Sequence, residues 1–509
     1  MEAFNQVSPC MQRKDYYLIG ILWLSALIIF LPLFYSDYIF MDEAFQLWGY
    51  RAVPGFYMFI DEGRWITEKL QGWLFSMTDT IHQVMWVRVF SLAGWLLCLP
   101  VWYAIIKREV ANVPHYKYLP FFTCLYLITS LPFLVAVQWA TCCQFFISDT
   151  ASFLAGAIAL NSIRGGDNER RLVVKAIIVP TLLGVASLFL YQGSWACFLI
   201  PFLLHFVNPI NIKKDKVLIG GMLVYLFVNA AYFVIYKISF IFFDFLPDPR
   251  NALYINPMEK ITFFLARPLE RSFRFTLLTD EDSRISKIYY LLTLLSLPVV
   301  VFLRFGKAKL FQAFKYGVVV LMIWLLTYLP DLLIKERYAS NRTMFALNLS
   351  VFIVCFEMAL YFIKNRLFLQ VAGVAMGLFF IFCARYNFYQ EFARPLVAET
   401  AALKNYFHKH YNKNIQTVHW IRPPQDELAK QFNIHVSMDE FGMANSFFTW
   451  VPEPLSKQLI YEETGDMPLA SKIVVKHWAS KEDYLRSGEK TDSTVLFIDT
   501  KEIIDALKH

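Results

Sequence analysis

Long apolar stretches, separated by short polar segments, follow one another from residue 17 to about residue 385. A helix needs roughly 20 mostly apolar residues to cross the hydrocarbon core of a bilayer, and most of the stretches approach that length. The pattern therefore predicts an all-α, polytopic membrane region. Its eleven predicted spans lie near residues 17–35, 84–106, 118–137, 145–163, 172–191, 194–209, 217–240, 286–303, 310–329, 344–363 and 366–385.

Lysine and arginine are concentrated in alternate loops between these stretches. The clusters are Arg13/Lys14, Lys107/Arg108/Lys117, Arg164/Arg170/Arg171, Lys213/Lys214/Lys216, Arg304/Lys307/Lys309 and Lys364/Arg366. Short cytoplasmic loops of membrane proteins carry an excess of such residues. We therefore predict a cytoplasmic N-terminus, and an odd number of spans then puts the C-terminus outside. The larger loops 36–83, 241–285 and 330–343 fall on the outer face.

The pattern changes after residue 389. Residues 396–412 have the spacing of an amphipathic helix. Short β-like runs follow at Thr417–Ile421, Lys472–Val475 and Thr494–Ile498. Helical stretches lie between these runs, and another helical stretch follows them at Thr500–Leu507. Such alternation of strands and helices predicts a small α/β domain. We expect residues 1–389 to form the membrane domain and residues 390–509 to form an extracytoplasmic α/β domain.

The composition agrees with a membrane protein. Hydrophobic residues make up 57% and charged residues 17% of the 509-residue chain, against roughly 45–50% and about 25% in soluble domains. The net charge of +7 lies mostly in the loops, where it sets topology and does not indicate a nucleic-acid partner. The chain has no CxxC pair, and its histidines are scattered, so we expect neither a metal site nor a cofactor.

Two acids, Asp42 and Glu43, come directly after the first apolar stretch. Acids at the mouth of a membrane helix must be hydrated, paired or used, because lipid offers them no partner. The same outer loop holds Asp61 and Arg64, and an amphipathic pattern begins at Arg64. A helix lying in the membrane interface would hold this guanidinium at the depth of lipid phosphates. The alternative is a solvated helix end without a function.

Further candidates lie in or near the other outer segments. Arg267, Arg271 and Arg274 would share one helical face if residues 258–276 were helical, although Pro268 would break or kink such a helix. They could equally be interfacial residues whose charged ends reach water. The remaining candidates are Arg342 at the start of a span, Asp149 as an acid within a span, and Tyr191 and Gln192 at an outer helix end, where packing and capping is the simpler interpretation.

Several of these residues together resemble a known pattern. An acid pair after the first span, a Trp-Gly pair, a Gly-Arg pair and an arginine at the start of the next span resemble the GT-C type of multi-span glycosyltransferase. Within that type the chain is similar to the bacterial O-antigen glucosyltransferases (the Gtr, or glucosyl transferase II, family). The matching residues are Asp42, Glu43, Trp48, Gly49, Gly63, Arg64 and Arg88, together with Leu190–Tyr191–Gln192. Glu43 stands where the family would have aspartate.

This resemblance implies a reaction and a location. Such enzymes take a sugar from a polyprenyl-phosphate carrier and modify a surface polysaccharide, such as the O-antigen of lipopolysaccharide, on the far side of the inner (plasma) membrane. It implies a hexose, glucose among the candidates, transferred with inversion. Asp42 would be the general base, Glu43 would orient it or bind acceptor hydroxyls, and arginines would bind the phosphate. The alternative is a transporter or flippase of a lipid-linked sugar, although the chain shows no inverted repeat of the kind transporters have.

Overall fold

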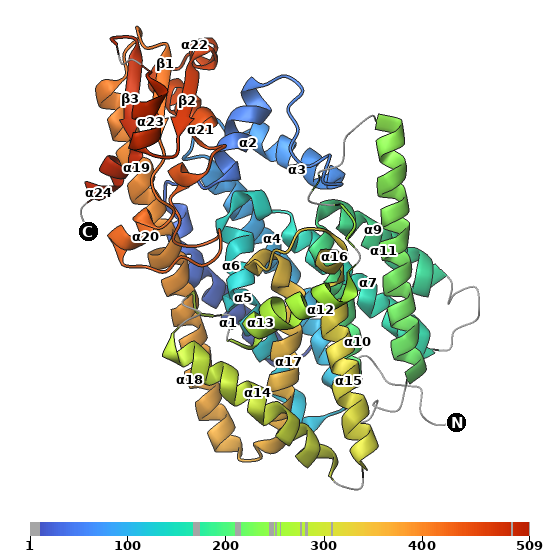
Figure 1. Ribbon diagram of the computed structural model, residues 1–509. Helices are drawn as coiled ribbons and strands as arrows, with labels where there is room; N and C mark the ends of the chain where they lie inside the picture. Colours follow the sequence, from blue (N-terminus) through green and yellow to red (C-terminus); the bar gives the residue numbers. More distant parts are fainter. Residues whose placement is uncertain are drawn as a thin grey trace.

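The computed structural model describes residues 11–165, 174–208, 215–243, 249, 252–254, 256–274, 277–279, 283–306, 309–489 and 492–507, and it is predominantly helical (Figure 1). The first helices are α1 Arg13–Phe30, η1 Leu31–Phe34, α2 Asp42–Ala52, α3 Trp65–Ser76, α4 Val84–Val110, η2 Pro114–Tyr118, α5 Leu119–Thr129, α6 Leu131–Gln138, η3 Ala140–Cys142 and α7 Phe145–Gly165. They are followed by η4 Val174–Ile178, α9 Val179–Leu190, η5 Gln192–Phe198, α10 Leu199–Val207 and α11 Asp215–Phe243.

The second half of the chain continues this helical arrangement. Its helices are α12 Pro257–Phe264, η7 Leu265–Leu269, α13 Glu270–Phe273, α14 Arg284–Phe305, α15 Leu310–Leu326, α16 Leu329–Leu333, η9 Asn341–Met344, α17 Phe345–Phe362, α18 Arg366–Tyr386, η10 Asn387–Ala393 and α19 Arg394–His410. The C-terminal part contains β1 Thr417–Ile421, α20 Glu427–Phe432, η11 Asn445–Phe447, α21 Pro452–Thr464, α22 Met467–Lys472, β2 Val474–Trp478, α23 Lys481–Ser487, β3 Val495–Asp499 and α24 Thr500–Asp505.

Seven helices of the described residues are long and apolar enough to cross a membrane. They are Arg13–Phe34, Val84–Val110, Ala140–Gly165, Lys216–Phe242, Arg284–Phe305, Asn341–Phe362 and Arg366–His410. The pair Tyr116–Thr129 and Leu131–Gln138, bent by 52°, makes eight if it crosses as one unit, and three apolar helices are shorter: Val179–Leu190, Gln192–Val207 and Leu310–Leu326. The chain is therefore a helical protein with seven or eight candidate spans, and eleven crossings stay a prediction.

Two backbone breaks divide the apolar stretches, one where the predicted spans 172–191 and 194–209 meet and one inside the predicted span 118–137. Tyr191 is extended, with φ −160° and ψ 121°, so that the apolar run around it becomes α9 and η5. Ser130 is also extended between α5 and α6, and Pro132 stands at the start of α6. Proline is well tolerated in the first turn of a helix, where its missing N–H has no partner within the helix, so Pro132 favours the start of a new helix at this point. Hydrophobicity alone does not reveal where a helix breaks.

The orientation relative to a membrane stays a prediction. Arg170, Arg171, Lys213, Lys214 and Lys307 from the basic loops lie outside the described residues, as does part of the predicted outer loop 241–285. The described part of that loop pairs with the loop 330–343. The residues Leu253 and Ile334 form an antiparallel bridge, and the amide of Lys335 donates to the carbonyl of Ala252 at 2.7 Å.

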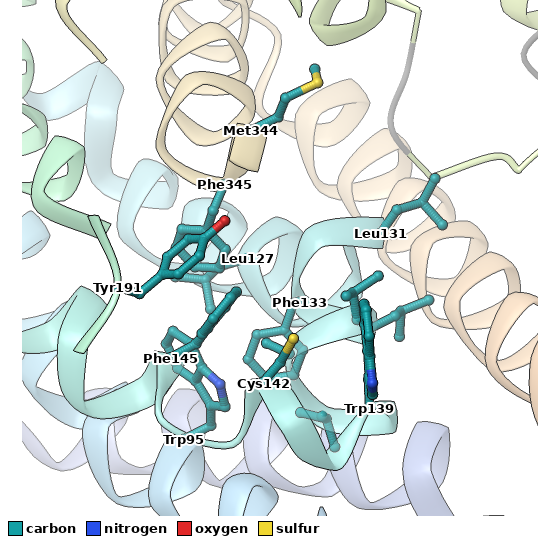
Figure 2. Packing of buried hydrophobic residues seen from close by; sticks show 14 of the residues in the cluster. Trp95, Leu127, Leu131, Phe133, Trp139, Cys142, Phe145, Tyr191, Met344 and Phe345 are labelled. Carbon is teal, nitrogen blue, oxygen red and sulfur yellow. The ribbon is translucent and has the colours of Figure 1, made fainter. Parts of the chain in front are cut away.

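Aromatic side chains fill the space between the helices (Figure 2). The ring of Trp95 packs against Phe133 and Phe345, with centroids 5.0 and 5.6 Å apart. Tyr191 stacks on Phe145 with centroids 4.4 Å apart. Figure 2 shows these five rings in one cluster, so the buried core reaches as far as the break between α9 and η5. Stacked and tilted rings of this kind add to the stabilisation that their buried area provides.

The C-terminal part contains a parallel three-stranded sheet in the order β2-β1-β3. Thr417 of β1 pairs with Val474 and Val495 on its two sides. The strands lie close to the predicted runs, with β2 beginning two residues later than expected. In Figure 1 the sheet lies at one end of the molecule, next to α2 and α21. The predicted boundary at residue 389 falls inside one helix, because α18, η10 and α19 continue without interruption from Arg366 to His410.

Candidate functional site

A cavity of about 850 Å³ lies where α2, the segment before α3, the break between α9 and η5, α11, α16, η9 and the C-terminal part meet. Its charged lining residues are Asp42, Glu62, Arg64, Asp331, Glu336, Arg342 and Asp439. Its aromatic lining residues are Phe45, Phe59, Trp139, Phe145, Tyr191, Tyr232, Phe233, Tyr236, Tyr338 and Trp450. Enclosed, mostly apolar clefts with a few converging polar groups are the usual form of small-molecule sites.

Asp42 is the first residue of α2 and is half-buried against the cavity. The residue before it, Met41, has φ 47° and ψ −116°, a backbone conformation that side-chain-bearing residues rarely adopt. The Met41 amide donates to Oδ1 of Asn445 at 2.6 Å, so the C-terminal part holds this turn. Burial raises the pKa of the Asp42 carboxyl to about 6, against the opposing effect of the Arg342 guanidinium.

Glu43, the neighbouring acid, is fully buried away from the cavity in an ion pair with Arg88. Its Oε1 accepts from the amide of Ala140 at 2.6 Å, and its Oε2 accepts from the amide of Phe40 at 2.8 Å. The Arg88 guanidinium lies 3.7 Å from the ring centroid of Tyr38. The sequence analysis selected both adjacent acids as site residues. The structure places only Asp42 at the cavity, because the carboxylate of Glu43 is bound by Arg88 and by two backbone amides.

Arg64 is held at the cavity by three neighbours. It pairs with Oε2 of Glu62 at 2.8 Å, its Nε donates to Oε1 of Gln192 at 2.9 Å, and its guanidinium lies 4.9 Å from the ring centroid of Tyr191. Gly63 before it has φ 75°, and a Cβ there would lie 2.5 Å from Tyr236. The Gly-Arg pair recognised in the sequence is thus a turn that only glycine fits, followed by a positioned cation.

The helix that follows Arg64 is oriented in an unusual way. Helix α3 forms where the amphipathic pattern predicts a helix. Its polar residues Thr67 and Gln71 are buried, with Thr67 Oγ1 donating to the carbonyl of Leu190 at 2.6 Å. Trp73 and Ile66 are exposed. Leu74 and Phe75 are buried together with these polar residues, and Lys69 is exposed beside the two apolar side chains, so the outer side of α3 combines apolar groups with a cation, as suits a membrane interface.

Arg342 lies at the cavity in η9, at the start of a candidate span. Its Nη2 donates to Oδ2 of Asp439 at 3.2 Å, and its guanidinium lies 4.6 Å from the ring centroid of Trp139. The next acid, Glu440, accepts from the amides of Asn341 and Arg342 at 2.8 and 3.2 Å. A loop of the C-terminal part therefore fixes the residue that sequence analysis selected from the loop 330–343.

Asp331 is a cavity acid that the sequence analysis did not select. It lies in the short helix α16, and burial, together with the neighbouring Glu336, raises the pKa of its carboxyl to about 7. Lys260 organises this segment, because its buried Nζ donates to the carbonyl of Ile334 at 2.5 Å and to that of Glu336 at 3.1 Å. The sequence feature that could have identified Asp331 is its position as a single acid between apolar residues, in the run Leu329–Leu333.

The charges of the cavity are unequal, with five carboxylates against two guanidiniums. Each arginine is already paired, Arg64 with Glu62 and Arg342 with Asp439. Among the described residues, the structure shows no ion pair for Asp42 or Asp331. Burial raises the pKa of both carboxyls towards neutral pH, which makes them the candidates of the cavity for proton exchange.

The remaining candidates lie outside the cavity lining. Asp61 is half-buried next to Glu62, and its backbone carbonyl accepts from the Tyr236 hydroxyl at 3.0 Å. Asp149 is buried within α7, where the Cys197 thiol is directed at Oδ1 with a sulfur–oxygen distance of 3.7 Å. The structure brings neither side chain to the group formed by Asp42, Arg64, Tyr191, Gln192 and Arg342.

The three arginines of the second outer loop do not share one face. The segment is divided into α12, the π-helix η7 and α13, with Pro268 inside η7. Arg267 is exposed, Arg271 is buried and donates to the carbonyl of Ala339, and Arg274 pairs with Glu270. The expected common face is wrong, because the proline widens the helix at that point and changes the register of the residues after it.

Comparisons with known proteins add no assignment. The chain matches no model of a known protein family, and a search of curated proteins gives no match. Within the residues that the structure describes, no group of three or more His, Cys, Asp or Glu side chains is arranged to hold a metal ion. The chemistry must therefore be argued from the cavity itself.

Proposed function

We propose that the protein is a membrane glycosyltransferase that moves a hexose from a polyprenyl-phosphate carrier to an extracytoplasmic glycan. The observation that carries the proposal is the meeting of Asp42, Arg64, Tyr191, Gln192 and Arg342 in one cavity of about 850 Å³. The resemblance to the O-antigen glucosyltransferases selected Asp42, Arg64, Tyr191 and Gln192 from separate parts of the chain, and Arg342 was selected because it stands at the start of a span. By that resemblance the enzyme lies in the inner membrane, with the cavity facing outward.

The two arginines are suited to the phosphate of the donor. A guanidinium has five N–H donors in a planar fork, so it can bind a phosphate while it keeps an acid partner. Arg64 uses Nε and one terminal nitrogen for Gln192 and Glu62, which leaves further N–H groups for a ligand. The apolar side of the cavity, which includes Leu226, Phe233 and Leu253, would receive the first isoprene units of the carrier.

Asp42 is the general base in this proposal. It accepts the proton of an acceptor hydroxyl while the hydroxyl oxygen bonds to the anomeric carbon of the hexose. The bond from that carbon to the phosphate oxygen breaks, and its electron pair leaves with the polyprenyl phosphate. Attack from the face opposite the phosphate inverts the anomeric centre. A carboxyl with a pKa near 6 is largely ionised at neutral pH and still basic enough for this step.

The test is bond cleavage by the full-length protein in nanodiscs. The donor is a panel of short-chain polyprenyl-phosphate hexoses labelled in the sugar, and the acceptor is cell-envelope glycan. The proposal expects release of polyprenyl phosphate together with label in the glycan. In liposomes, a flippase would instead move the intact donor to the other leaflet. Movement of the label without bond cleavage, or neither event with every donor, would overturn the proposal.

A further inference from the structure

The C-terminal part contributes one large aromatic side chain to the cavity wall. Trp450 is 43% exposed, and it lines the same cavity as Asp42. Its indole N–H donates towards the Asp42 carboxyl. Trp450 and Asp42 are separated by more than 400 positions in the chain, so only the folded structure brings them together.

The backbone around Trp450 is held firmly in place. Its ring packs against Phe448 with centroids 5.1 Å apart, and Phe448 packs against Phe40 at 6.4 Å. Nearby, the buried carboxylate of Glu399 accepts from the amides of Asn445 and Ser446 at 2.8 and 2.9 Å. The position of the indole relative to the acid is therefore set by packing and hydrogen bonds on both sides.

Asn445 connects this segment directly to the site. Its Oδ1 accepts from the amide of Met41, the residue before Asp42. The carboxylate and the indole are thus mounted on one hydrogen-bonded unit. Side chains that must act together on one ligand need this kind of support.

The chemistry of this wall fits a neutral sugar. The face of an aromatic ring is electron-rich, and a pyranose presents a face of weakly positive C–H groups with hydroxyls at its edge. The carboxylates of Asp42 and Asp439 lie in the same lining and can accept hydrogen bonds from such hydroxyls. They would repel the phosphate of a lipid headgroup, so an anionic lipid surface fits this wall less well.

We propose that Trp450 is a binding platform on which a hexose of the acceptor glycan stacks, with one of its hydroxyls directed at Asp42. The role of this hexose as acceptor rests on the proposed function. The stacking itself is a binding property and can be measured without any transfer. The C-terminal part then supplies the acceptor side of the cavity through Trp450, and it also fixes Arg342 through Asp439.

The test uses the full-length protein in nanodiscs and a panel of neutral gluco-, galacto- and manno-oligosaccharides of two to six residues. Saturation-transfer NMR and titration give the dissociation constant of each. We expect Trp450→Ala to weaken binding of the recognised oligosaccharide at least tenfold, and Trp450→Phe, which keeps a ring face, to restore most of it. Trp73→Ala is the matched control, because Trp73 is 57% exposed but lies outside the cavity lining.

Each other outcome overturns the proposal. The platform does not exist if no member of the panel binds the wild-type protein, or if Trp450→Ala binds as well as the wild type. Equal losses with Trp450→Ala and Trp73→Ala indicate a general contact with lipid. Failure of the proposed function looks different. In that case oligosaccharides bind through Trp450, but no polyprenyl phosphate is released from any donor.

Discussion

Acids lie at both ends of the helical bundle, but among the acidic side chains that the structure describes only those at the end away from the cavity are all held in ion pairs. At the end away from the cavity, Glu357 pairs with Arg304 at 2.6 Å and accepts from the hydroxyl of Tyr116. Glu109 at the same end pairs with Arg164 and Arg108. At the cavity, Asp42 and Asp331 line open space.

Under the proposed function, this difference favours the cavity end of the bundle as the place of the reaction. A buried charge is tolerated when a partner and hydrogen bonds compensate for its lost hydration, and the acids of the first end have both. The carboxylates of Glu357 and Glu109 are held in ion pairs, so they are not free to accept a proton from a ligand. A carboxylate at a cavity keeps its capacity for a ligand or a proton. The same difference separates two neighbouring residues, because Glu43 forms an ion pair with Arg88 and Asp42 does not.

The largest expected effect is that of Asp42→Asn on the rate. Asparagine keeps the shape of the side chain but cannot accept the proton, so the rate of hexose transfer should fall by about 10²–10⁴-fold. The melting temperature should stay within a few degrees of the wild type, because no ion pair is lost. Single-turnover release of polyprenyl phosphate measures the rate. A variant that transfers within threefold of the wild type would remove Asp42 from the mechanism.

Glu43→Gln should have the opposite profile. Removing one partner of a buried ion pair costs about 3–5 kcal/mol, because the charge of Arg88 is left without compensation. We expect lower thermal stability, with a rate per folded molecule that stays within a few-fold of the wild type. The control is the double variant Glu43→Met/Arg88→Met, which removes both charges and should be more stable than Glu43→Gln. A stable but inactive Glu43→Gln protein would place Glu43 in the mechanism after all.

Arg64→Ala should weaken donor binding by about tenfold to a hundredfold, since a hydrogen bond to a charged group contributes about 1.5–3 kcal/mol. Binding of a labelled polyprenyl-phosphate hexose to nanodiscs measures this effect. Arg267→Ala is the matched control, because that arginine is exposed and lies outside the cavity lining. Equal losses in the two variants would mean that the arginines act through general attraction of the anionic lipid.

The rate should depend on pH with a midpoint near 6. The base must be ionised, so the rate should rise as the pH passes upward through the pKa of Asp42, and level off above it. One pH unit below that midpoint, the rate should be about tenfold lower than on the plateau. Asp331→Asn should keep this midpoint. A rate that falls between pH 5 and pH 7 would contradict a carboxylate base.

The smallest expected effect is that of Asn445→Ala. Loss of its hydrogen bond to the Met41 amide removes about 1 kcal/mol of support from the turn before Asp42, which corresponds to roughly fivefold in rate. A positioning role also requires the pH midpoint to shift, because the surroundings of the carboxyl change. A reduced yield of folded protein with an unchanged pH profile would show a merely structural role.

Local patterns predicted the elements of this fold well. Helix α3 and strand β1 form where amphipathic and β-like runs were recognised, since both depend on neighbouring residues. The break at Tyr191 falls where two predicted spans meet, whereas the break at Ser130 was not predicted, because the chain is apolar on both sides of it.

For the site, the sequence indicated several of the residues involved, but it did not indicate which of them lie together in the folded protein. Asp42 and Arg64 were selected from one loop, and they do line one cavity. Glu43 looked equivalent to Asp42, because its partner Arg88 lies 45 positions away in the chain. Asp439 and Trp450 belong to a part of the chain with no recognisable motif, so only the folded structure brings them to the cavity.

The most direct test of the central claim is a structure of the protein with a bound donor analogue. A C-linked phosphonate analogue of a short polyprenyl-phosphate hexose cannot be cleaved and keeps the charge of the donor. The account predicts its phosphonate within hydrogen-bond distance of Arg64 or Arg342 and its hexose in the cavity, with the anomeric carbon on the side of Asp42. An analogue bound outside this cavity, while the cavity stays empty, would contradict the account.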